Sequence, residues 1–349
     1  MSATSPAETS SIETEEQLEE ALSRPTDADA EAMTALEGDL LILGVSGKMG
    51  PTMVRLAKRA CEKAGVSKRM IGAARFSNPG SRESFEREGV ETVTCDLLDR
   101  AAVDALPDCS NVLFMVGQKF GTQGNQPLTW AINSYIPGIV AERFRDARIV
   151  SFSTGNVYPF TPVKSGGPVE TDPTGPVGEY AQSALSRERI FEYFSDRNGT
   201  PVAILRLNYA IDLRYGVLRD IAEKVYHRKP VALAMGYANV IWQRDANSVA
   251  LRSFAHCSSP AFVLNLTGAE TLSVREVAQQ FGKYWGIEPV LEGTENETAL
   301  LSNAARCREI FDAETVSVEQ MITWVAKWVE QGGRGLGKPT HFEERTGSF

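Results

Sequence analysis

Three glycines spaced three residues apart, Gly44, Gly47 and Gly50, constrain the fold of this 349-residue chain most strongly. They follow a short apolar run, Leu40–Leu43, that predicts a buried strand, and they open an amphipathic stretch that predicts a helix through about Glu62. Small residues at such a turn let the backbone approach a ligand and let the helix pack close to the strand. Free N–H groups at a helix N-terminus favour phosphate. The turn therefore predicts a dinucleotide site, with a plain tight turn as the alternative.

Strand and helix signals alternate from Asp39 to about Leu207, with helical stretches between most of the short apolar runs. Such alternation predicts an α/β fold with a Rossmann-type, doubly wound parallel sheet. The alternation loosens afterwards, which predicts a smaller C-terminal substrate-binding lobe. We therefore expect an acidic arm at 1–38, a dinucleotide-binding domain at 39–207, mainly a substrate lobe at 208–330 with a possible return to the sheet, and a tail at 331–349.

The formal charge of −9 is confined to residues 1–38, which hold ten acidic residues and one arginine. The neutral remainder offers no excess positive charge to a nucleic-acid backbone. Two short helices are predicted in the arm, one from Thr14 to Leu22 and one capped by Thr26 or Asp27. We interpret the arm as a solubilising, partly disordered extension, with packing on a partner subunit as the alternative.

Several classes of protein are disfavoured by composition. No apolar run approaches the ~18 residues that a membrane helix needs, and the polar N-terminus resembles no secretory signal. Five scattered cysteines are typical of reduced thiols, which predicts a cytoplasmic protein. The three histidines lie far apart without acidic or cysteine neighbours, so no metal site is expected.

The end of the second predicted strand bears on the choice of cofactor. Arg75 follows that strand, where NAD-binding proteins place an acidic residue. An arginine can hold a 2′-phosphate, so we expect NADP, with NAD possible. Asp96 and Leu97 follow the third strand and are expected near the adenine. The other expected cofactor contacts, beside the three glycines, are Ser46, Lys48, Met49, Val116 and Gly117.

Over about residues 39–330 the chain resembles the extended short-chain dehydrogenase/reductase family of NAD(P)-dependent epimerase/dehydratase type. The glycine turn, the acid Asp96, the run at 151–158 and the pair Tyr180 and Ser183 carry this resemblance, in the family's order and spacing. The resemblance implies a nicotinamide cofactor and a sugar or sugar-derived substrate. It also implies a homodimer through residues 130–144 and 180–194.

The resemblance further implies that Tyr180 moves the proton while Thr154 holds the substrate oxygen, with Ser153 as the alternative. The family's lysine, four residues after the tyrosine, is replaced by Ala184. An unperturbed tyrosine has a pKa of ~10, so losing the cation should impair alcohol oxidation more than ketone reduction. The candidate replacement cations are Arg187, expected at the surface, and the loop residues Lys119 and Lys164.

Polar side chains near the predicted strand ends and in the lobe are candidates for substrate contacts. Amides and arginine suit a polyhydroxylated or anionic ligand; the candidates are Gln118, Asn133, Asn156, Asn208 and Arg244. The sequence thus predicts an NAD(P)-dependent oxidoreductase or epimerase of sugars with atypical proton transfer. The alternatives are a catalytically silent NAD(P)-binding redox sensor or regulator, and a non-redox lyase or isomerase using the same pocket.

Overall fold

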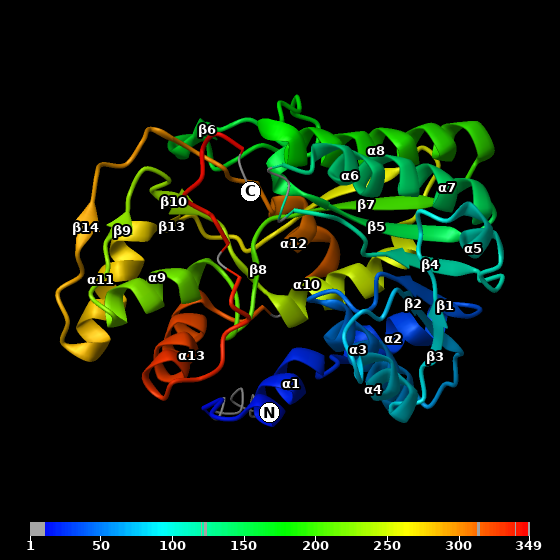
Figure 1. Ribbon diagram of the computed structural model, residues 1–349, viewed down its shortest axis with the longest axis horizontal. Helices are drawn as coiled ribbons and strands as arrows, with labels where there is room; N and C mark the ends of the chain where they lie inside the picture. The colour runs from blue at the N-terminus through cyan, green and yellow to red at the C-terminus, as the bar shows by residue number, and fades with distance from the viewer. Residues whose placement is uncertain (1–10, 120, 122–123, 313–314, 339, 348–349) are drawn as a thin grey trace, which may run out of the picture.

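A seven-stranded sheet in which all strands run parallel forms the centre of the computed structural model (Figure 1). The predicted fold class is therefore confirmed. The strands, in sheet order, are β12 (Phe262–Leu266), β7 (Val202–Leu207), β5 (Arg148–Thr154), β4 (Asn111–Phe114), β1 (Leu40–Leu43), β2 (Met70–Ala74) and β3 (Glu91–Thr94). The structure describes residues 11–119, 121, 124–312, 315–338 and 340–347.

Helices cover both faces of this sheet (Figure 1). One face carries α3 (Gly50–Ala64), α4 (Ser81–Arg87), α10 (Gln243–Arg252) and α12 (Ala305–Phe311). The other carries α5 (Arg100–Asp104), α6 (Gln126–Trp130), a π-helical turn (Ala131–Tyr135), α7 (Ile136–Arg143) and α8 (Gly178–Asn198).

The side chains of β1 alternate between two hydrophobic cores, because successive residues of a strand point to opposite faces. Leu40 and Ile42 pack in the core beneath α3 and α10. Leu41 and Leu43 pack in the core beneath α7 and α8. A strand buried on both faces explains the uninterrupted apolar run in the sequence.

A smaller lobe lies beside the carboxyl ends of the strands (Figure 1). It contains α9 (Val217–Tyr226), α11 (Val274–Trp285) and α13 (Val318–Glu330), packed around residues such as Trp242, Phe281 and Trp324. Between 208 and 330 the chain returns to the first unit as α10 and β12. Short strand pairs complete the lobe and its edge: β8 (Ala210–Ile211) with β11 (Ile241–Trp242), β9 (Val231–Ala232) with β14 (Leu291–Glu292), β10 (Tyr237–Ala238) with β13 (Leu272–Ser273), and β6 (Thr161–Pro162) with β15 (Thr298–Ala299).

The acidic arm folds as two capped helices, α1 (Glu15–Ser23) and α2 (Asp27–Ala35). Thr14 and Thr26 each form a capping box with the residue three positions on. Leu18 of α1 is fully buried in the core of the smaller lobe, and Met33 of α2 is fully buried in a core of the sheet. The arm therefore joins the two parts of the molecule.

Several carboxylates of the arm are paired with the body of the protein. Glu20 contacts Arg59 at 2.7 Å, and Glu19 accepts a hydrogen bond from Arg214 at 2.6 Å. The expectation of a solubilising, partly disordered extension is wrong for residues 11–37, because these contacts and the buried leucines fix the arm to the same chain. Residues 1–10 lie outside the described residues.

The C-terminal segment runs back between the two parts of the molecule, as the red trace of Figure 1 shows. The Leu336 N–H donates to the Arg214 carbonyl at 3.0 Å, and the Thr340 N–H donates to Asp220 at 2.8 Å. Phe342 is 1% exposed. The described part of residues 331–349, which were expected to form a loop-like tail, is therefore anchored between the sheet and the smaller lobe. Within the described part of the chain, no helix is long and apolar enough to span a membrane.

We expect Leu18→Ala to lower the free energy of unfolding by ~2–5 kcal/mol, because it leaves a cavity in the core of the lobe. Denaturant unfolding measures this loss. Glu16→Ala, on the exposed side of the same helix, is the control and should change stability by no more than ~0.5 kcal/mol. Equal stability of the two variants would show that the arm is not docked in solution.

Candidate active site

The glycine turn connects β1 to α3 with very close packing. Gly44 has a φ of 83°, in the left-handed region. A Cβ added to Gly50 would lie 1.9 Å from the Val45 carbonyl oxygen, so only glycine fits there. No side chain caps the start of α3, and Met49, Gly50, Pro51 and Thr52 line the larger hollow, so the positive end of the helix dipole faces that space. These features fit the pyrophosphate of a dinucleotide.

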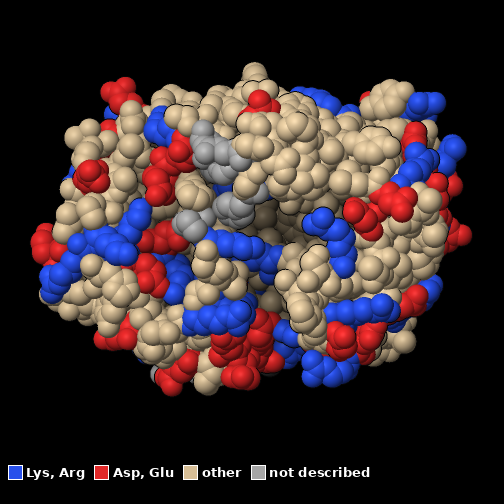
Figure 2. All heavy atoms as spheres, in the orientation of Figure 1, with Lys and Arg blue, Asp and Glu red and all other residues tan. Residues whose placement is uncertain are grey.

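Two hollows meet at this turn, and Figure 2 shows the opening between the two parts of the molecule, with basic side chains around it. The first, of about 440 Å³, lies over the ends of β2, β3 and β4. The second, of about 700 Å³, lies between the sheet and the smaller lobe. Of the expected cofactor residues, Gly44, Ser46, Gly47 and Gly117 line both hollows. The first hollow alone is lined by Arg75, Asp96, Leu97 and Val116, and the second alone by Lys48, Met49 and Gly50.

The expected hydroxyl pair lies at the wall of the larger hollow. Thr154 ends β5; its hydroxyl donates to the Asn156 side-chain oxygen at 3.0 Å, and the Tyr180 hydroxyl of α8 hydrogen-bonds to the same threonine. The Asn156 N–H donates to the same threonine oxygen at 3.2 Å. The Ser153 hydroxyl instead donates to Glu188 at 2.5 Å. Thr154 thus lies next to Tyr180, whereas Ser153 is engaged by the helix behind it.

Burial raises the pKa of the Tyr180 hydroxyl above its ordinary value, while the Arg187 charge and the Thr154 hydrogen bond partly oppose this rise. The protonated form of Tyr180 is therefore dominant at neutral pH. A protonated phenol next to a substrate pocket is suited to donate a proton.

The position of the missing lysine is occupied only by a methyl group, since Ala184 is 0% exposed. Arg187, expected at the surface, is 5% exposed, and that expectation is wrong. Its guanidinium donates to the Phe152 carbonyl at 2.8 Å and to the Asn133 side-chain oxygen at 2.7 Å. The spacing in the sequence places Arg187 on the same helix face as Tyr180. Phe114 of β4, Phe152 of β5 and Asn133 of the π-helical turn cover its side chain.

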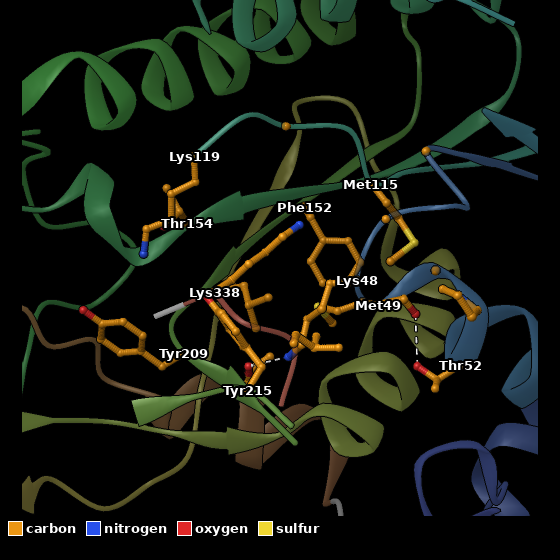
Figure 3. A pocket seen from close by; sticks show the side chains of 18 of the residues that line it. Lys48, Met49, Thr52, Met115, Lys119, Phe152, Thr154, Tyr209, Tyr215 and Lys338 are labelled. Atoms are coloured by element: carbon orange, nitrogen blue, oxygen red, sulfur yellow. Dashed lines mark hydrogen bonds between the residues drawn. The ribbon is translucent and has the colours of Figure 1, made fainter. Parts of the chain in front are cut away.

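Three lysines line the larger hollow, as Figure 3 shows for Lys48, Lys119 and Lys338. Burial lowers the pKa of Lys48 and of Lys119 to about 8, although Asp212 and Asp220 respectively oppose this. Both lysines are therefore mainly cationic at neutral pH and lose charge as the pH rises through 8. The other loop candidate, Lys164, is exposed and does not line either hollow.

Several residues of the larger hollow escaped the sequence analysis. Tyr209 and Tyr215 follow β7 and face the pocket in Figure 3. Tyr209 has a φ of 45°, which is unusual for a non-glycine residue and marks a constrained turn. Leu336 and Lys338 come from the C-terminal segment. No local signal marks these residues, because they reach the hollow only through the path of the chain in the lobe.

The expected substrate residues divide into three groups. Asn156 and Asn208 line the larger hollow, and Gln118 lines the smaller one. Asn133 is 0% exposed and is used internally, since it bonds the Gln118 backbone, Ser183 and Arg187. Arg244 lines neither hollow; it donates to the Arg24 carbonyl and to Asp245 where the arm docks.

The model of the NAD dependent epimerase/dehydratase family matches residues 40–233. This match spans more than half of the chain, so the chain belongs to that family. The resemblance and the enzyme class expected from the motifs are confirmed. No curated protein matches the chain.

Solved structures of sugar-nucleotide enzymes share the fold. A dTDP-glucose 4,6-dehydratase from Bacillus anthracis in complex with NAD is 16% identical, with a TM-score of 0.71 over 84% of this chain and 97% of the other. A UDP-glucuronic acid 4-epimerase from Bacillus cereus in complex with NAD is 16% identical, with a TM-score of 0.69 over 84% and 99%. A UDP-glucose 4-epimerase from Thermotoga maritima with UDP-glucose is 16% identical, with a TM-score of 0.66 over the same shares.

Proposed function

We propose that this protein is an NAD(P)-dependent oxidoreductase or epimerase of a sugar derivative, with Tyr180 as the proton donor and Thr154 as the group that orients the substrate oxygen. The proposal rests on the hydroxyls of Tyr180 and Thr154, which hydrogen-bond to each other at the wall of the larger hollow. The larger and the smaller hollow share the glycine turn. The crowded glycine turn supports a dinucleotide with its pyrophosphate at α3.

The raised pKa of Tyr180 favours one direction of the chemistry. When bound, the nicotinamide would supply or accept the hydride at the substrate carbon. Tyr180 would give its proton to the substrate oxygen during ketone reduction, and Thr154 would hold that oxygen by its hydroxyl. Alcohol oxidation requires the ionised tyrosine, which burial disfavours. We therefore propose ketone reduction as the favoured direction.

The substrate that fits the larger hollow is a polyhydroxylated, anionic molecule. The hollow of about 700 Å³ presents the side chains of Asn156 and Asn208 together with three lysines. Amides suit sugar hydroxyls, and lysines suit phosphate or carboxylate. Since the solved structures of the same fold include complexes with UDP-glucose, we propose a sugar nucleotide as the substrate class.

Two alternatives have an observation in their favour. The absence of a lysine at Ala184 favours a silent NAD(P)-binding sensor, and the same pocket would serve a non-redox lyase or isomerase. A sensor does not require the hydroxyl pair or the lysine-lined hollow. Turnover of nicotinamide with a keto sugar nucleotide distinguishes these alternatives.

We expect Tyr180→Phe to lower kcat for reduction of a 4-keto sugar nucleotide by about 10²-fold or more, because the proton donor is removed. Stopped-flow loss of NADPH absorbance measures the rate, and NADPH fluorescence titration measures binding, which should persist. Tyr284→Phe, at an exposed tyrosine of α11 that lines neither hollow, is the control. Full activity of the Tyr180 variant would disprove the assigned proton donor, and absence of nicotinamide turnover by the wild type would favour the alternatives.

The smaller hollow supports NADP as the cofactor. Arg75 is exposed at its wall, next to Ser77 and Asn78, with no acidic residue directly after β2. A free guanidinium is suited to a 2′-phosphate. Arg82, in contrast, is held by Glu86 and Thr92.

We expect NADPH to bind about tenfold or more tightly than NADH, and Arg75→Ala to remove most of that preference, because one charge-assisted contact contributes ~1.5–3 kcal/mol. Fluorescence titration with both nucleotides provides the comparison. Arg82→Ala is the matched control and should leave the ratio unchanged. Tighter binding of NADH that Arg75→Ala does not alter would overturn the preference for NADP.

The exposed face of α6, the π-helical turn, α7 and α8 supports a homodimer. Trp130, Tyr135, Gly138, Ile190 and Phe194 line a shallow apolar surface there. Tyr135 is 57% exposed and Tyr193 is 55% exposed. Such an apolar patch on a soluble chain is typical of an interface.

We expect Ile190→Glu to convert the dimer to a monomer, because it places a charge in the centre of the apolar surface. Light scattering after size-exclusion chromatography gives the molar mass. Tyr284→Glu, at an exposed aromatic residue of α11, is the control. A wild type that is monomeric at all accessible concentrations would remove this proposal.

A further inference from the structure

Helix α8 carries Ala184 where the family pattern has a lysine. About two turns after Tyr180 it carries a second cationic position, the buried Arg187. Ala184, four residues after the tyrosine, is fully buried and carries no charge. Arg187, seven residues after it, lies on the same helix face but ~10 Å further along the axis. Helical side chains incline toward the N-terminus, so a long arginine can extend back over the space that a small residue at 184 leaves open.

The guanidinium of Arg187 lies directly behind the point where the two hollows meet. A Cβ added to Gly117, which lines both hollows, would lie 2.7 Å from one of its nitrogens. The opposite nitrogen donates to the carbonyl of Phe152, two residues before Thr154. The ring of Phe114 lies 5.8 Å from the guanidinium carbon. Two of its neighbours, Gly117 and Phe152, therefore line the same hollow as Tyr180 and Thr154.

No carboxylate forms a direct ion pair with this guanidinium among the described residues, although the charge of the neighbouring Glu188 acts on it. The adjacent Glu188 is engaged by Arg206 at 2.8 Å and by Ser153, and the hydrogen-bond acceptors of Arg187 are a backbone carbonyl and an amide. The Nε atom of Arg187 has no hydrogen-bond partner in the described part of the structure. A buried cation without a directly paired anion is costly, which points to an electrostatic role for Arg187.

We propose that Arg187 supplies the positive charge that the lysine absent at position 184 would supply, and that it acts as a positioning residue for Tyr180. It stabilises the ionised tyrosine through space and holds the strand that carries Thr154. The inference rests on the proposed function of Tyr180 in proton transfer. Because an arginine does not release its proton, Arg187 supplies a fixed charge and no proton relay.

Other charged or titratable groups also surround the hollow of Tyr180. Tyr209 and Tyr215 line it from the lobe, and the cations in its lining are Lys48, Lys119, Arg214 and Lys338. Asp220, beyond these tyrosines, is engaged by Thr340. Glu179, next to Tyr180 in the chain, accepts a hydrogen bond from Trp130, at 2.5 Å. Variants of Arg187 must therefore be compared with a variant that changes the same charge elsewhere.

The test reads the ionisation of residue 180 directly and needs no turnover. We would incorporate 3-fluorotyrosine at position 180 of the full chain and follow its ¹⁹F resonance against pH. Arg187→Met should raise the titration midpoint by about one pH unit or more, because a close opposite charge is lost. Arg187→Lys should keep the midpoint close to the wild-type value. The double variant Ala184→Lys/Arg187→Met should bring the midpoint most of the way back to that value. Arg189→Met, at an exposed arginine paired with Glu192, is the matched control.

An unchanged midpoint in folded Arg187→Met would overturn the inference and leave Arg187 a packing residue. Should that variant fail to fold, Arg187→Lys and the double variant still decide, since a midpoint above the wild-type value in both would contradict a charge role. If the wild type shows no nicotinamide turnover but Arg187→Met still raises the titration midpoint of residue 180, the proposed function is wrong. The electrostatic coupling between Arg187 and Tyr180 would then still stand.

Discussion

The buried ion pair between Glu188 and Arg206 is the interaction on which the site depends. Their side chains are 0% and 4% exposed, and two nitrogens of the guanidinium donate to the carboxylate. The pair ties α8 to β7, and Glu188 also accepts from Ser153 on β5. Removing one partner of such a pair leaves a buried charge that costs several kcal/mol. The register of the catalytic helix over the strand ends therefore follows from this contact, and with it the meeting of Tyr180 and Thr154.

Electrostatics in the site are dominated by burial. Burial raises the pKa of Tyr180 and lowers the pKa of Lys48 and Lys119 to about 8. The neutral tyrosine and the mainly cationic lysines together suit delivery of a proton to an anionic substrate. A cation held behind Gly117 moderates the cost of ionising Tyr180 without entering the hollow. In the proposed arrangement, Arg187 would supply the positive charge that Ala184 does not carry.

Local sequence signals predicted the features that depend on neighbours in the chain. The apolar run of β1, the glycine turn and the alternation of strands and helices follow from periodicity and from backbone geometry. The docking of the arm was missed because α1 buries Leu18 against a lobe built from residues some two hundred positions later. Arg187 was misjudged because its spacing gives a helix face and no information on what covers that face. Tyr209 and Lys338 reach the pocket by the tertiary path of the chain, which leaves no local pattern.

The most direct test of the account is a crystal structure of the protein with NADPH bound. We expect the pyrophosphate at the first turn of α3, the nicotinamide ring beside the hydroxyls of Tyr180 and Thr154, and the Arg187 guanidinium still behind Gly117. A nicotinamide bound away from Tyr180, or an Arg187 side chain turned out to solvent, would contradict the assigned chemistry.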